Sequence, residues 1–71
     1  MINIEDLIPL LRKGWVAMDK SKHWCWFKTK PTRISFCWVN HNCTYWIASA
    51  SLSCFDIAPV EDWEKSLRKV G

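Results

Sequence analysis

The sequence predicts an α+β domain in which a small antiparallel β-sheet of 4-5 strands is flanked by an N-terminal and a C-terminal helix. Apolar residues recur at helical spacing near both ends, whereas the centre alternates apolar and polar residues between turn signals. A third observation is that five of the six tryptophans lie in this central stretch. The predicted order is α-β-β-β-β(-β)-α, within a single domain of residues 1–71.

The first predicted helix covers residues 3–13. Asn3 is placed to cap it, and Gly14 is placed to end it as a residue with positive φ. Pro9 lacks the amide for a mid-helix hydrogen bond, so the helix either kinks there or starts later. Four apolar residues form its buried stripe: Ile4, Leu7, Ile8 and Leu11.

Residues 15–30 form a predicted β-hairpin, because apolar runs at 15–18 and 24–27 flank a polar turn at 19–22. Two registers are open. A two-residue loop would place Trp15 opposite Trp26, and a three-residue loop would place Val16 there instead. No Asn-Gly turn chooses between them.

The next predicted strands cover residues 33–39 and 43–48, joined by a turn at 40–42. Residues 49–51 are small and predict a break or a bend, and residues 52–57 predict a last short strand. Whether 43–57 is one bent strand or two stays open.

The second predicted helix starts at Ala58-Pro59, because proline fits the first helical turn. Its apolar stripe has spacings of three, four and three: Val60, Trp63, Leu67 and Val70. Large apolar residues also occur at both parities of the strands, and two short helices cannot cover both sheet faces. We therefore expect a homo-oligomer.

The N-terminal residues show no positively charged secretory segment, and no apolar run is long enough to span a membrane. We therefore expect a cytoplasmic protein, without membrane association. In a reducing compartment the four cysteines are expected to be free, buried thiols rather than disulfides or metal ligands: Cys25, Cys37, Cys43 and Cys54.

No enzymatic motif is present. The chain lacks a P-loop, a G-x-S-x-G elbow, an H-E-x-x-H helix and the C-x2-C spacing of structural zinc sites. Its two glycines leave no loop that could cradle a phosphate. We therefore predict a protein that is not an enzyme and uses no metal or cofactor.

The candidate binding site combines tryptophans with the basic stretch of the chain. Trp24 and Trp26 share one strand face, and cations follow them at Lys28, Lys30 and Arg33. Aromatic rings with neighbouring cations hold bases and phosphates. The alternative is a packed aromatic face with a solvated lysine rim, which would suit a subunit interface.

Four segments carry a family resemblance: GWVAMD at 14–19, WCWF at 24–27, KP at 30–31 and FDIAPVEDWEKSL at 55–67. They resemble short uncharacterised proteins of tailed phages and prophages, least so over 32–50. The resemblance implies an accessory protein of a bacterial host's cytoplasm, of a kind that includes inhibitors of antiviral defence.

Three functions follow as hypotheses. The first is a binding protein that sequesters a nucleotide-type signal, such as a cyclic oligonucleotide, or a host defence protein. The second is a single-stranded nucleic-acid-binding protein that uses the same surface. The third is a structural or oligomerisation module without a small-molecule ligand.

Overall fold

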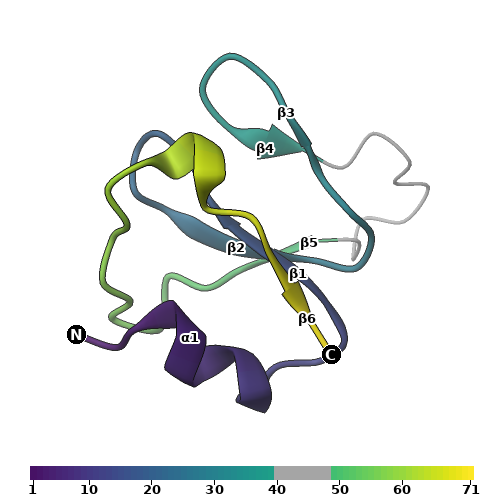
Figure 1. Cartoon of the computed structure of the whole chain (residues 1–71), viewed down its shortest axis with the longest axis vertical. Helices are drawn as coiled ribbons and strands as arrows, with labels where there is room; N and C mark the ends of the chain where they lie inside the picture. Colours follow the sequence, from purple (N-terminus) through teal and green to yellow (C-terminus); the bar gives the residue numbers. More distant parts are fainter. Residues whose placement is uncertain (40–48) are drawn as a thin grey trace.

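A computed structural model describes residues 1–39 and 49–71. A four-stranded antiparallel sheet of order β5-β2-β1-β6 lies at its centre, with a two-stranded β3-β4 sheet beside it and one short α-helix (Figure 1). The elements are α1 (Ile4–Leu7), η1 (Ile8–Leu10), β1 (Gly14–Met18), β2 (Trp24–Phe27), β3 (Thr32–Arg33), β4 (Trp38–Val39), β5 (Ser49–Ser51), η2 (Trp63–Lys65) and β6 (Arg68–Val70). The α+β class and the antiparallel sheet are thus confirmed, but two flanking helices are not.

The N-terminal helix is shorter than the predicted 3–13. Its predicted cap is present, since the side chain of Asn3 accepts a hydrogen bond from the Glu5 amide. The α-helix ends at Leu7 and continues as the 3-10 turn η1, which contains Pro9 in its first positions. Proline has no N–H for the next i→i−4 bond, so the chain changes its winding there.

The predicted hairpin is confirmed as β1 and β2. Val16 lies opposite Trp26 and Met18 lies opposite Trp24, which is the second of the two registers that the sequence left open. The loop between the strands closes through the Asp19 amide on the carbonyl of His23. This register places Val16, Met18 and both tryptophans on one face of the sheet.

That face carries the hydrophobic core. Residues from α1, both hairpin strands and the C-terminal half of the chain form one buried cluster: Ile4, Leu7, Val16, Met18, Trp24, Leu52, Ile57 and Val70. On the opposite face Ala17 and Phe27 are buried as well. Since these two residues are covered within a single chain, they do not need a second copy to cover them. Self-association remains a prediction.

The predicted single strand over 33–39 is wrong. The chain reverses there, so β3 and β4 form a two-stranded sheet in which Arg33 lies opposite Trp38. The Ile34 amide donates to the carbonyl of Cys37 and closes a tight turn. This turn leaves Phe36 exposed at its tip, although the alternation of residues had placed it in a strand.

The segment after residue 48 also differs from its prediction. Residues 49–51, predicted as a break, are β5 and pair with β2, with Ala50 opposite Trp26. Small side chains suit this position because the facing indole is large. The predicted strand over 52–57 is absent, and only Ile57 forms an isolated bridge, to Ile2. The predicted turn at 40–42 and strand at 43–48 lie outside the described residues.

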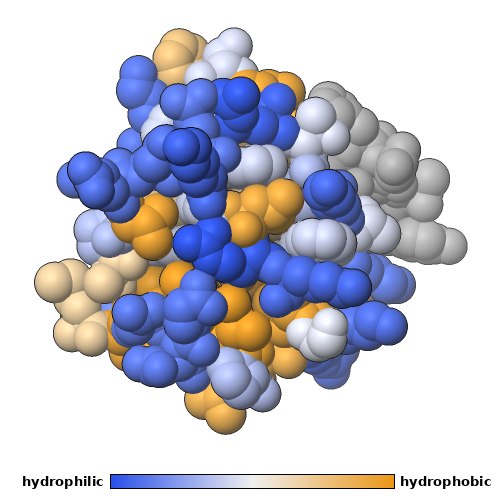
Figure 2. Space-filling model, in the orientation of Figure 1, coloured by the Kyte–Doolittle hydropathy of each residue, from blue (hydrophilic) through white to orange (hydrophobic). Residues whose placement is uncertain are grey.

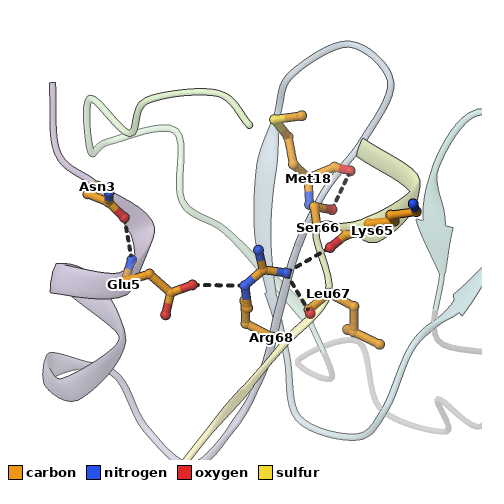
Figure 3. A network of polar contacts seen from close by, with 7 residues as sticks. All are labelled: Asn3, Glu5, Met18, Lys65, Ser66, Leu67 and Arg68. Atoms are coloured by element: carbon orange, nitrogen blue, oxygen red, sulfur yellow. Dashed lines mark hydrogen bonds and ion pairs between the residues drawn. The ribbon is translucent and has the colours of Figure 1, made fainter. Parts of the chain in front are cut away.

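The predicted C-terminal helix is not formed. Residues 58–62 are non-helical, η2 supplies a single 3-10 turn, and β6 then pairs with the free edge of β1. Ser66 is fully buried at this junction, and its hydroxyl accepts a hydrogen bond of 2.8 Å from the Met18 amide (Figure 3). A lone helix of this length is marginally stable, so pairing with β1 outweighs its helical pattern.

Arg68 ties this C-terminal segment to the N-terminal helix. Its Nε donates to a carboxylate oxygen of Glu5, and its Nη1 donates to the carbonyls of Lys65 and Leu67 (Figure 3). Glu5 is itself in the turn that Asn3 caps. The two ends of the chain are therefore joined through one guanidinium group.

Candidate functional site

A groove of about 500 Å³ lies between the η1–β1 connection and the β2–β5 side of the sheet. Its volume is within the range of small-molecule sites. The described residues that line it are Leu11, Arg12, Lys13, Trp26, Lys28, Ala50 and Leu52. An indole and three cations thus border the same space.

The indole of Trp26 is the aromatic surface of the groove. Its Nε1 donates a 3.0 Å hydrogen bond to the carbonyl of Arg12, which fixes the ring relative to the η1–β1 connection. Ala50 lies opposite on β5 and adds only a methyl group. The ring is half-buried, so part of it remains accessible to a ligand.

Gly14 makes room for this ring. A Cβ at residue 14 would lie 2.4 Å from the Phe27 carbonyl oxygen and 2.8 Å from two atoms of the Trp26 indole. The prediction that Gly14 ends a helix with positive φ is wrong, because it is the first residue of β1 and its φ is not positive. Its glycine identity follows from close packing with the indole.

The charge of the groove is positive. Arg12 and Lys13 approach from the η1–β1 connection and Lys28 from the residue after β2, and no acidic residue is among the described residues that line it. A groove with this balance attracts anions. The arrangement can therefore bind a ligand that carries both an aromatic group and a negative charge.

The five predicted site residues are only partly brought together. Trp26 and Lys28 line the groove. Trp24 shares their sheet face, but it belongs to the core with 3% of its surface exposed, and its Nε1 has no hydrogen-bond partner among the described residues. A ring in this position supports the fold and offers no surface for stacking.

The other two predicted residues lie elsewhere. The Lys30 ammonium is 5.7 Å from the centre of the Trp15 ring, on the opposite sheet face from Trp26. Arg33 forms an ion pair with Glu64 and lies 5.9 Å from the Trp63 ring. Arg33 thus joins β3 to the C-terminal segment and Lys30 lies over Trp15, so neither charge is part of the groove.

Two groove residues, Arg12 and Lys13, were not predicted, because they fall in the last turn of the predicted helix over 3–13, where cations suit the helix dipole. The predicted hairpin contained the signal that would have found them. Since Trp15 pairs with Phe27, the residues just before β1 lie beside those just after β2, where Lys28 is.

The described cysteines are free, but none is buried as predicted: Cys25 and Cys37 are half-buried and Cys54 is exposed. Cys43 lies outside the described residues. Burial, together with the nearby Asp19 and Cys37, raises the pKa of the Cys25 thiol from 9.0 to about 11. Among residues 1–39 and 49–71, no group of three or more His, Cys, Asp or Glu side chains could hold a metal ion.

Cys25 should therefore react slowly with iodoacetamide at neutral pH, because the thiolate is the nucleophile and a raised pKa reduces its population. Below the pKa, two units correspond to about 100-fold less thiolate. The rate should rise with pH until about 11, and peptide mass spectrometry can follow it beside the exposed Cys54. Equal rates at the two cysteines in the folded protein, at neutral pH, would contradict this expectation.

A serine–histidine pair lies on the surface near the start of β2. The ring of His23 is 2.9 Å from the hydroxyl of Ser51, which also accepts a hydrogen bond from the Ser53 amide. The last contact is a local serine turn. Because the pair is exposed, we assign it a role in holding the turn after β5.

Comparison with models of known protein families, with curated proteins and with solved structures finds no match. In the part of the chain that the structure describes, no helix has the length and apolar character that crossing a membrane requires.

Proposed function

We propose that this chain is a non-enzymatic binding protein that captures a nucleotide-type ligand in the groove and acts by sequestering it. The observation that carries the proposal is that the Trp26 indole lines the same groove as three cations, Arg12, Lys13 and Lys28. A base would stack on the indole and the phosphates would pair with the cations.

The energies of stacking and of hydrogen bonding to phosphate favour a nucleotide as the ligand. Stacking a base on an aromatic side chain contributes about 1–3 kcal/mol, and hydrogen bonds from cations to phosphate are stronger than neutral ones. Trp26 is also held in place before binding, through its bond to Arg12, which lowers the entropic cost of ordering it.

The resemblance to phage proteins supplies a biological setting for the proposal. A sequestering protein in the cytoplasm of a bacterial host would remove a nucleotide signal of antiviral defence. Cyclic oligonucleotides are ligands of that chemistry, with aromatic bases and anionic phosphates.

A host defence protein is a second candidate partner. Phe36 is 64% exposed at the β3–β4 turn and Ile34 is 43% exposed beside it, as protein-binding surfaces require. Figure 2 shows that polar residues separate the apolar areas over much of the visible face, with more apolar surface near α1. The groove supports the nucleotide more directly, because its charge selects a ligand.

Titration of tryptophan fluorescence with a cyclic dinucleotide tests the proposal. We expect saturable quenching, its loss in Trp26→Phe, and about tenfold weaker binding in Lys28→Ala, because one phosphate contact is removed. Lys65→Ala is the matched control, since the exposed Lys65 side chain is not among the described residues that line the groove.

Two results would overturn the proposal. One is a flat titration with the folded protein, and the other is equal weakening by Lys28→Ala and Lys65→Ala. Titration with single-stranded DNA of increasing length distinguishes the nucleic-acid alternative from binding of a small ligand. Affinity that grows with strand length and falls steeply with salt would favour that alternative over a small ligand.

A further inference from the structure

The three cations of the groove come from two separate parts of the chain. Arg12 and Lys13 precede β1, and the Arg12 carbonyl binds the Nε1 edge of the Trp26 indole. Lys28 is two residues beyond Trp26, which corresponds to about 7 Å along an extended chain. The indole therefore borders the same space as cations from two parts of the chain.

These cations are also uncompensated. In residues 1–39 and 49–71, the side-chain ion pairs use Arg33 with Glu64 and Arg68 with Glu5, and none uses a groove cation. Like charges around one partly apolar space repel each other, more strongly than in bulk water. An anionic ligand would relieve this repulsion, and a ligand with more charge would relieve more of it.

We propose that the groove selects nucleotides that carry at least two phosphate groups, one paired with Arg12 and Lys13 and the other with Lys28, beside a base stacked on Trp26. This inference rests on the proposed function and specifies its ligand. It makes phosphate number, rather than base identity, the main determinant of affinity. Arg12 holds the indole through its backbone carbonyl, and its guanidinium forms no ion pair with the described residues.

Isothermal titration calorimetry with adenosine, AMP and ADP, without divalent cations, tests the inference. We expect ADP to bind about tenfold or more tightly than AMP, and AMP more tightly than adenosine. Arg12→Ala and Lys28→Ala should each reduce the advantage of ADP over AMP to less than threefold. Arg12→Ala keeps the carbonyl that holds Trp26, so circular dichroism should confirm an intact fold.

The outcomes of these titrations distinguish failure of the selection by phosphate number from failure of the proposed nucleotide binding. No heat with any of the three ligands, and no fluorescence change with the cyclic dinucleotide, would overturn both. Equal affinity for adenosine, AMP and ADP would overturn the selection by phosphate number and leave nucleotide binding standing. An unchanged ADP preference in both variants would overturn the assignment of the two phosphate contacts.

Discussion

Gly14→Ala should lower the free energy of unfolding by about 3 kcal/mol, at the upper end of the usual cost of overpacking. The added Cβ would lie 2.4 Å from the Phe27 carbonyl oxygen, which is backbone in the neighbouring strand. A shift of that strand disturbs the β1–β2 pairing. The methyl group would also press on the Trp26 indole, at 2.8 Å, so the variant should also lose the proposed nucleotide binding.

Urea denaturation followed by circular dichroism measures this cost. Gly71→Ala is the control, because the nearest neighbours of a Cβ at residue 71 are atoms of Lys13 at 3.1 Å or more. Its effect should be about 1 kcal/mol, the cost of a positive φ in a residue with a side chain, and so well below that of Gly14→Ala. Adding Trp26→Ala to Gly14→Ala should not restore stability, since the contact with the Phe27 carbonyl remains. Wild-type stability in Gly14→Ala would contradict the packing.

Ser66→Ala should lower the free energy of unfolding by about 2 kcal/mol, the cost of leaving a buried polar group without a partner. The Met18 amide donates to the Ser66 hydroxyl, whose own hydrogen faces the carbonyls of Trp63 at 2.6 Å and Met18 at 3.1 Å. Removing the hydroxyl leaves that amide buried and unpaired. The contact joins β1 to the approach of β6, so β6 should also exchange its amide hydrogens faster.

Ser53→Ala is the matched control for Ser66→Ala. It removes the same hydroxyl from an exposed serine, whose hydroxyl contacts Ser51, where water can replace it. Its effect should stay within about 0.5 kcal/mol. Equal losses in the two variants, or unchanged amide exchange of β6 in Ser66→Ala, would contradict the role assigned to the buried hydroxyl.

The parts of the fold that could be predicted are those decided by neighbouring residues. Asn3 caps α1 because its side chain reaches an amide two residues away. The β1–β2 hairpin follows from two apolar runs around one polar turn. In both cases the deciding contacts lie within a short stretch, so the pattern contains them.

The C-terminal segment shows why a correct periodicity can mislead. Val60 and Trp63 pack against the hydrophobic core and Val70 belongs to it, as a helical stripe would require. The partner that decides their conformation is the free edge of β1, about fifty residues earlier, and the buried Ser66 contact reinforces it. Helical spacing records which residues are apolar, but not which strand edge is available to them.

For the binding site, the sequence alone selected Trp26 and Lys28 and the chemistry of an aromatic ring beside cations. Only the tertiary structure decided that Trp24 is core, that Lys30 and Arg33 lie elsewhere, and that Arg12 and Lys13 complete the groove. The physical reason is that pairing between strands decides these positions. The β1–β2 pairing brings the residues before β1 beside those after β2, and the β3–β4 pairing places Arg33 opposite Trp38, outside the groove lining.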